Sequence, residues 1–329
     1  MGEIEWGILV VNYLFLAGVS AGAFAMSGLA TYIGGPHLRR VARIGALIAP
    51  WPAAIGVGLL VLDLGRPVAF YHLFLTVEWT SPMSIGAWLL TAFILMSLVY
   101  ALLWLPAPLD SLLRVPTRLG DVPHYGRWHP ISHLTVRRWR AILAAVGFPI
   151  SLGIGIYTGI LLGAVPARPF WNTPMLAQLF LFSAMSTGTA TVLLLTALLG
   201  TRKESGYEEE RRLLVSTDMV LIILEILMLI PFFLHHALAP WSSATSIQLI
   251  LGGEFTPWFW IGVVLFGIVV PFAIEGYELY PVVLKEGSAR YGLVLSLASS
   301  VLVLVGGFTL RYVFVFAGQV SHFLPVVAR

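Results

Sequence analysis

The chain has 329 residues, of which 58% are hydrophobic and only 11% charged, and its formal net charge at pH 7 is +3. Soluble globular domains carry about 25% charged residues, so this composition excludes an ordinary soluble protein and indicates that membrane lipid is the solvent. The absence of cysteine excludes disulfides, iron–sulfur clusters and thiolate metal sites within this protein. So small a net charge gives no reason to expect nucleic acid as a partner.

Eight apolar stretches follow one another along the sequence. Each is long enough to cross a hydrocarbon core of about 30 Å, which takes about 20 helical residues. Each must be helical, because irregular backbone facing lipid would leave peptide groups without hydrogen-bond partners. The sequence therefore predicts an all-α integral membrane protein with eight transmembrane helices. The predicted spans are 8–33, 44–64, 84–105, 140–164, 174–199, 215–238, 257–275 and 292–317.

The distribution of basic residues predicts which way these helices face. With the N-terminus outside the cytoplasm, 15 of the 19 Lys and Arg residues fall on the cytoplasmic side. The other four, Arg66, Arg168, Arg311 and Arg329, are then external, in agreement with the positive-inside rule. The first seven residues contain two Glu and no basic residue, so we expect the first span to stay in the mature protein. Both termini are expected outside the cytoplasm.

A local pattern recurs between the two halves of the sequence. Ser20-Ala21-Gly22-Ala23 in the first span matches Ser186-Thr187-Gly188-Thr189 in the fifth, and Gly155-Ile156-Tyr157-Thr158 in the fourth matches Gly306-Gly307-Phe308-Thr309 in the eighth. The pattern favours two parallel four-helix bundles, although small residues recur in any membrane helix because they let backbones approach closely. We expect a first bundle from residues 1–105 and 140–165, a basic cytoplasmic loop over 106–139, and a second bundle over 174–320. The second bundle has Phe308 where the first has Tyr157, so a hydroxyl is present in one half only.

Polar side chains within hydrocarbon are costly, which makes each one a functional candidate. Four lie at one depth near the outer face: Asn12 in the first span, Asp63 and Arg66 at the end of the second, and Tyr157 about 10 Å inside the end of the fourth. Such a set suits a quinone head group, whose oxygens need donors when oxidised and acceptors when reduced. The alternatives are an interfacial aromatic for Tyr157 and a helix-end ion pair for Asp63 with Arg66.

Acidic residues in the sixth and seventh spans form a second candidate group. Asp218 and Glu225 are seven residues apart, hence on one helix face, and Glu275 and Glu278 near the inner end of the seventh span would extend the same path. A proton relay and a structural hydrogen bond between helices are both open for these carboxyl groups. Arg311, about two turns from the outer end of the eighth span, is expected to snorkel or to pair with a carboxylate.

Several motifs in a common order resemble the NrfD/polysulfide reductase family of membrane subunits over nearly the whole sequence. Each motif alone is weak, whereas the ordered set is specific. The matching segments are NYLFLAGVSAGA from Asn12 to Ala23, DLGRP from Asp63 to Pro67, SPMSIGAW from Ser81 to Trp88, Tyr157-Thr158-Gly159, PFWNTP from Pro169 to Pro174, Leu310-Arg311-Tyr312 and Gly318-Gln319.

The resemblance implies a multi-pass, haem-free subunit of the bacterial cytoplasmic (inner) membrane that exchanges electrons between menaquinone or ubiquinone and an extracytoplasmic iron–sulfur subunit. In this family the partner, a four-cluster ferredoxin-like protein, often serves a molybdopterin or other catalytic subunit. The family associates quinone binding with an Asn on the first helix and a Tyr on the fourth, which Asn12 and Tyr157 match. A His of the same pocket has no counterpart near Phe15, and His72 in an external loop is a candidate to replace it.

The residues and the resemblance agree that electrons must pass to another protein. All eight histidines fall in loops or at helix ends, so ligands for a buried haem are not expected, and a redox role requires a partner cluster close to the quinone. The external loops are the expected docking surface, with Glu78, Trp79, Arg168 and Trp171. The competing hypotheses are a secondary transporter or ion channel that uses the mid-membrane acids, and a structural anchor that binds no quinone. Transporters more often show inverted repeats, whereas the repeat here is parallel.

Overall fold

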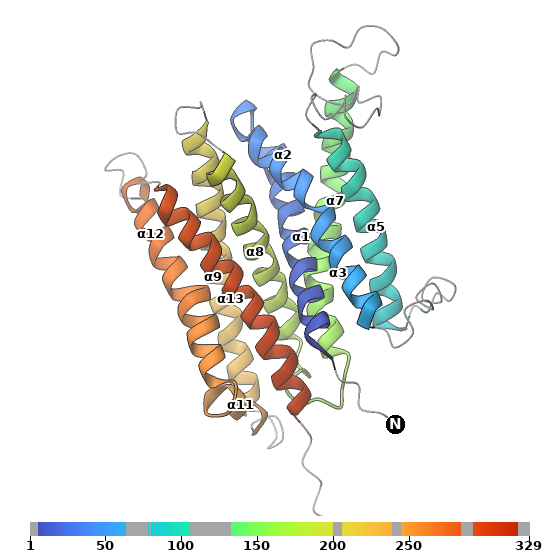
Figure 1. Cartoon of the computed structure of the whole chain (residues 1–329), viewed down its shortest axis with the longest axis vertical. Helices are drawn as coiled ribbons and strands as arrows, with labels where there is room; N and C mark the ends of the chain where they lie inside the picture. Colours follow the sequence, from blue (N-terminus) through green and yellow to red (C-terminus); the bar gives the residue numbers. More distant parts are fainter. Residues whose placement is uncertain are drawn as a thin grey trace, which may run out of the picture.

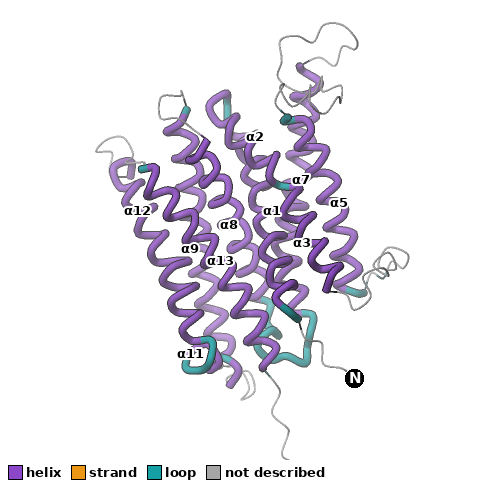
Figure 2. The backbone as a smooth tube through the Cα atoms, in the orientation of Figure 1, coloured by secondary structure: helices purple, strands orange, loops and turns teal. Residues whose placement is uncertain are grey.

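The computed structural model describes residues 6–63, 78, 80–105, 133–199, 206–238, 245–283 and 292–321. In these ranges all regular structure is helical. Eight helical units are long and apolar enough to cross a membrane, which confirms the predicted number of spans. They run roughly side by side along one axis (Figures 1 and 2).

The first four spans match the predicted order with two differences. They are α1 (Ile8–Ile33), α2 with α3 (Arg39–Ile48 and Pro50–Asp63), α5 (Pro82–Leu103) and α7 (His133–Gly163), and a 3-10 turn, η1 (Pro36–Leu38), precedes α2. The second span is interrupted at Ala49, because Pro50 and Pro52 lack the N–H groups that would continue the helical hydrogen bonds. Helix α7 begins at His133, so residues 133–139 of the predicted loop are helical.

The last four spans also keep the predicted order. They are α8 (Met175–Leu199), α9 (Tyr207–Leu238), η3 with α12 (Trp258–Val269 and Val270–Val283) and α13 (Leu293–Val320), and a short helix, α11 (Gln248–Leu251), precedes η3. Helix α9 begins at Tyr207, before the predicted residue 215, and its first turn holds three Glu residues, which the helix dipole favours there. Element η3 is a π-helix, in which backbone hydrogen bonds span five residues instead of four.

The spans form one packed assembly, and their division into two groups of four, which we keep for description, stays a prediction. In the first group α1 contacts α2, α3 and α7, and α5 contacts α7; in the second group α8 contacts α9 and α13, and α13 contacts η3 and α12. Helices α1 and α8 lie against each other at the centre, and we call their contact the seam (Figure 1). Helix α7 also contacts α8, and α1 also contacts α13. A Cβ atom added to Gly22 or to Gly188 would overlap the backbone of the other helix. The glycines of the repeated pattern therefore touch each other across the seam.

Different interactions link distant segments at the two ends of the molecule. The start of α1 and the end of α13 lie at one end (Figure 1), where Trp6 N donates to Gln319 Oε1 at 2.6 Å and Gln319 Nε2 donates to Trp6 O at 2.8 Å. At the opposite end, where α2 and α9 begin, Arg40 Nε donates to both carboxylate oxygens of Glu210 at 2.9 and 3.2 Å. We call the first end outer and the second inner, and the side that each faces stays a prediction from charge.

Candidate functional site

The phenol of Tyr157 is buried between helices of the first bundle. Tyr157 lies six residues before the end of α7 at Gly163, and 6% of its surface is exposed. Its hydroxyl end packs against Gly86 of α5 so closely that a Cβ atom on Gly86 would overlap the phenol. Gly86 belongs to the SPMSIGAW segment, so the glycine of that motif makes the space that Tyr157 occupies.

A second phenol, that of Tyr13 on α1, lies beside Tyr157. Tyr13 is fully buried, and its ring packs against Gly56 of α3, where an added Cβ atom would lie 3.4 Å from Cδ2. The Tyr13 and Tyr157 hydroxyl groups are near enough to interact, yet Tyr13 Oη forms no hydrogen bond of regular geometry with any residue that the structure describes. The sequence analysis gave Tyr13 no role. The only indication in the sequence was its position next to Asn12, from which it points about 100° away on the helix.

The other predicted quinone residues lie nearer the outer end. Asn12 is half-buried and donates from Nδ2 to Ile8 O at 2.9 Å within its own helix. Asp63 is exposed at the end of α3, and its Oδ1 lies 3.7 Å from the position of a Cβ atom on Gly7 at the start of α1. Arg66 and His72 fall outside the described residues, as does Trp79 of the predicted docking surface. The structure therefore pairs Tyr157 with Tyr13, and it places Asn12 and Asp63 around the start of α1.

Trp171, predicted to meet a partner, is folded into the molecule. Only 2% of its surface is exposed, its Nε1 donates to Phe314 O on α13 at 2.7 Å, and its ring stacks on Trp6 with centroids 5.1 Å apart. It therefore fastens the loop between α7 and α8 to α13 and presents no open ring to a partner. Arg168 is half-buried and donates to Ser321 O at 3.2 Å, while Glu78 is exposed; a docking role for these two stays a prediction.

Besides Glu210, which pairs with Arg40, the second bundle buries four carboxyl groups among the described residues, and three of these four accept hydrogen bonds from serine. Asp218, Glu275 and Glu278 are fully buried, and Glu225 is 6% exposed. The serine contacts are Ser186 Oγ to Asp218 Oδ1 at 2.6 Å, Ser299 Oγ to Glu275 Oε1 at 2.7 Å, and Ser296 Oγ to Glu278 Oε1 at 2.8 Å. The acids were singled out from the sequence but the serines were missed, although their three-residue spacing on α13 was an available signal.

Further contacts and charge interactions bring these groups close to one another. The carboxyl groups of Asp218 and Glu275 contact each other, and Glu225 contacts Ser183 and is attracted by Arg311. Arg311 Nη1 donates to Ser183 Oγ at 3.0 Å and to Gly307 O at 2.7 Å. We call the row the polar chain; its members are Glu278, Ser296, Glu275, Ser299, Asp218, Ser186, Glu225, Ser183 and Arg311. From Ser296 to Arg311 on α13 it spans about 22 Å of helix at 1.5 Å per residue.

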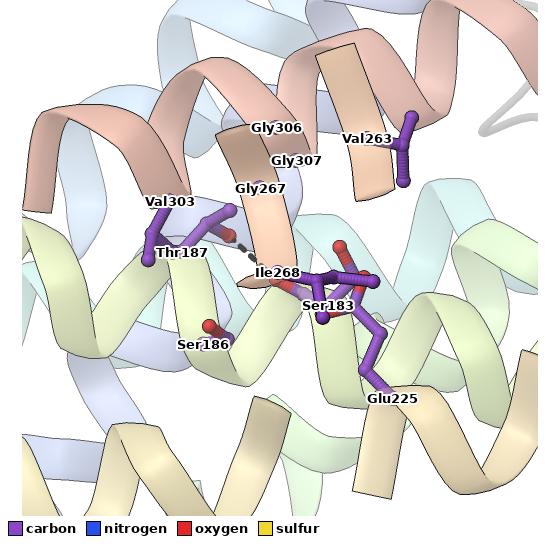
Figure 3. Close-up of a pocket in the computed structure, with 10 residues that line it drawn as sticks. All are labelled: Ser183, Ser186, Thr187, Glu225, Val263, Gly267, Ile268, Val303, Gly306 and Gly307. Carbon is purple, nitrogen blue, oxygen red and sulfur yellow. Dashed lines mark hydrogen bonds between the residues drawn. The ribbon is translucent and has the colours of Figure 1, made fainter. Parts of the chain in front are cut away.

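A narrow pocket lies along the middle of the polar chain. Figure 3 shows Glu225 reaching from α9 toward Ser183 on α8, with Gly267 of η3 and Gly306 of α13 nearby. The empty space between the lining atoms is about 210 Å³, but it is so divided that a water molecule does not fit. A Cβ atom on Gly306 would overlap Gly267, so η3 and α13 are in direct backbone contact here.

Arg311 ends the polar chain at the seam. Its side chain is fully buried, and Nη2 lies 2.9 Å from the position of a Cβ atom on Gly18 of α1. Its guanidinium carbon is 5.9 Å from the ring centre of Phe15, also on α1, and 5.5 Å from that of Phe180 on α8. Arg311 is thus hydrogen-bonded to Ser183 and attracted by the charge of Glu225, without an ion pair to a carboxylate among the described residues. At Arg311 the row approaches the first bundle.

Known proteins resemble this one over almost its full length. The family model described as Polysulphide reductase, NrfD matches residues 1–322. Protein NrfD of Escherichia coli (strain K12) is 30% identical over 97% of this sequence and 96% of its own length. A chain of the polysulfide reductase of Wolinella succinogenes is 30% identical over 96% of this sequence and 95% of its own length. A subunit of the selenate reductase of Mesobacillus selenatarsenatis is 25% identical over 82% of this sequence and 66% of its own length.

Proposed function

Because the chain belongs to the NrfD/polysulphide reductase family, we propose that it is the quinone-reactive membrane subunit of a respiratory oxidoreductase. It lies in the bacterial cytoplasmic membrane and exchanges electrons between menaquinone or ubiquinone and an extracytoplasmic iron–sulfur subunit. Two relatives are named as parts of a polysulfide reductase and of a selenate reductase, which supports a membrane role beside a separate catalytic subunit.

The buried phenol of Tyr157 carries this proposal. A hydroxyl group can donate to the carbonyl of a quinone and accept from the hydroxyl of a quinol, so it serves both redox states. Tyr157 lies in the outer part of the first bundle with a second phenol beside it, and Asn12 on α1 offers an amide nearer the surface. These donors and acceptors fit a quinone head group, which when bound supplies the transfer of two electrons and two protons. Asp63 at the outer edge is a candidate acceptor for a released proton.

Electron transfer beyond the quinone requires a second protein. The sequence has no cysteine, so it offers no thiolate to ligate an iron–sulfur cluster. The clusters belong to the partner subunit, and a cluster near the quinone needs a docking surface at the outer end of the first bundle. Glu78 and Arg168 are the described residues that we propose for this contact.

The polar chain is the proposed proton route of the second bundle. Carboxyl and hydroxyl groups both donate and accept hydrogen bonds, so neighbouring members can pass a proton along the row. The contact between Asp218 and Glu275 supports this role, because two carboxylates so close together are stable when they share a proton. The route begins at Glu278 near the inner end and stops at Arg311 beside α1.

The test is to purify the protein with its bound partners and to measure quinol turnover in the Tyr157→Phe variant. We expect an iron–sulfur subunit to copurify and turnover to fall about 100-fold, since the variant loses a donor and acceptor at the reacting oxygen. Tyr100→Phe is the control, because Tyr100 is a buried tyrosine of the same bundle whose hydroxyl contacts Ser27 and Thr31. Unchanged turnover in Tyr157→Phe would contradict the proposed site. Solute uptake by the purified protein alone in proteoliposomes would support a transporter instead.

A further inference from the structure

We propose that Tyr13 is a positioning residue, whose hydroxyl sets the direction of the Tyr157 hydroxyl in both redox states of the quinone. The inference deepens the proposed function and rests on it. It concerns a side chain on the neighbouring helix α1, within the matching segment from Asn12 to Ala23, to which the sequence analysis gave no role of its own.

Stability alone does not explain the hydroxyl of Tyr13. The side chain is fully buried, and its oxygen forms no hydrogen bond of regular geometry with the part of the molecule that the structure describes. A buried polar group in this state destabilises the folded protein. Phenylalanine would fill the same space on Gly56 without that cost. The hydroxyl therefore points to a task that phenylalanine could not perform.

The packing around the two phenols indicates that the Tyr13 hydroxyl acts on Tyr157. Gly56 on α3 accommodates the ring of Tyr13, and Gly86 on α5 accommodates the hydroxyl end of Tyr157. Each glycine leaves room for a phenol inside the bundle, where α1 and α7 are in direct contact. The Tyr157 hydroxyl is thereby the polar group that Tyr13 meets.

During turnover Tyr157 must donate a hydrogen bond to the quinone and accept one from the quinol. A neighbouring hydroxyl can hydrogen-bond to Tyr157 in both situations. When Tyr157 donates its hydrogen to a quinone carbonyl, Tyr13 can donate to the Tyr157 oxygen. When Tyr157 accepts from a quinol hydroxyl, its own hydrogen can turn toward the Tyr13 oxygen. In both cases a rotation of each O–H bond lets the two hydroxyl groups form a hydrogen bond, because a phenol is both donor and acceptor. Tyr13 itself does not touch the quinone in this arrangement.

Tyr100 provides a matched comparison for Tyr13. Both are fully buried tyrosines of the first bundle, but the Tyr100 hydroxyl lies 2.9 Å from Thr31 Oγ1 and receives a hydrogen bond from Ser27 Oγ at 3.2 Å. Its hydroxyl therefore stabilises the helix contacts near the inner end. Replacing each tyrosine with phenylalanine removes one oxygen and leaves the ring.

The experiment compares Tyr13→Phe with Tyr100→Phe in the purified complex. For Tyr13→Phe we expect an unchanged or higher Tm, a kcat for quinol that falls about 10-fold, and a KM that stays within about twofold, because orientation and not affinity is lost. For Tyr100→Phe we expect a lower Tm and an unchanged kcat. A Tyr13→Phe complex with lowered Tm and unchanged kcat would overturn the inference.

A double variant separates this inference from the proposed function. In a Tyr157→Phe background we expect Tyr13→Phe to lower kcat no further, because Tyr13 acts through the hydroxyl that is already missing. Two effects that multiply would show that Tyr13 acts independently, which contradicts a positioning role. If Tyr157→Phe retains full turnover, the proposed site fails; if Tyr157→Phe is impaired and Tyr13→Phe is not, only the role of Tyr13 fails.

Discussion

Matching positions of the two bundles hold the same residue in different surroundings. Ser20 on α1 and Ser186 on α8 are equivalent in the repeated pattern, and both are buried. The Ser20 hydroxyl donates to the carbonyl of Ala49 at the break between α2 and α3, whereas the Ser186 hydroxyl donates to the carboxylate of Asp218. Ser20 therefore stabilises the break in the second span. Ser186 stabilises an acidic side chain within the membrane. The two bundles thus share a frame of small residues but differ in the groups that this frame supports.

The fourth helix of each bundle shows the same divergence. Tyr157 faces Gly86 and Tyr13 within its own bundle, whereas Phe308 turns to the seam and meets Phe15 edge to face, with ring centres 5.6 Å apart. Phenols are therefore concentrated in the interior of the first bundle and carboxyl groups in that of the second. This difference supports a division between quinone chemistry and proton movement.

The largest expected effect is a loss of stability at the seam, where the small residues of α1 and α8 touch. Gly188→Ala places a methyl group where the backbone of Gly22 lies, so α1 and α8 must separate along the seam. We expect the free energy of unfolding to fall by about 3 kcal/mol, measured as a fall in the Tm of the detergent-solubilised protein. Gly28→Ala is the control, because its nearest neighbour would be 3.6 Å away in ordinary contact. Equal stability of the two variants would contradict a tight seam.

The next effect concerns the first bundle alone. Gly86→Ala forces the phenol of Tyr157 out of its place, and we expect quinol turnover to fall at least about 10-fold while the protein stays folded. Gly58→Ala on α3 is a suitable control, since an added Cβ atom there meets nothing within 4 Å. The idea is wrong if both variants turn over quinol at the same rate.

A change in the second bundle is expected to alter quinol turnover less and to act mainly on proton movement. Glu225→Gln keeps the size of the side chain and removes its ability to release a proton. We expect the number of protons moved per electron to fall in proteoliposomes, with KM for quinol unchanged within about twofold. Glu209→Gln on the same helix is exposed and should behave as the unaltered protein. A normal proton yield in Glu225→Gln would remove this acid from the route.

The smallest effect is expected where the bundles meet at the inner end. The ion pair of Arg40 with Glu210 links α2 to α9, and the Arg40 side chain is 20% exposed. We expect Arg40→Gln to lower the free energy of unfolding by about 1 kcal/mol without changing turnover. A double-variant cycle with Glu210→Gln measures the coupling, and a coupling energy near zero would show that the pair does not join the bundles.

The sequence predicted the number and order of the spans, because apolar length reports directly on membrane crossing. It did not predict the π-helix over Trp258–Val269, since a stretch that is apolar on all sides carries no periodicity from which a wider turn could be read. The prolines that interrupt the second span were visible, but hydropathy treats the stretch as continuous.

The candidate site was predicted where a polar residue stands out against hydrocarbon, as with Tyr157, Asp218 and Glu225. Contacts between distant segments could not be predicted from spacing, and for this reason the meeting of Tyr13 with Tyr157 appeared only in the fold. Trp171 shows the opposite difficulty. It lies in the loop between α7 and α8 and was expected on the surface, yet its hydrogen bond to α13 draws it inside.

The tight pocket beside Glu225 also bears on how the proposed proton route would avoid a leak. A continuous file of water through the second bundle would let protons run down their electrochemical gradient without any redox turnover. In this structure no water molecule fits between the lining residues, and the backbones of Gly267 and Gly306 touch. If the polar chain conducts protons as proposed, leakage along it would be limited by how often η3 and α13 separate. The glycine contact would then conserve the energy stored across the membrane while the subunit is idle.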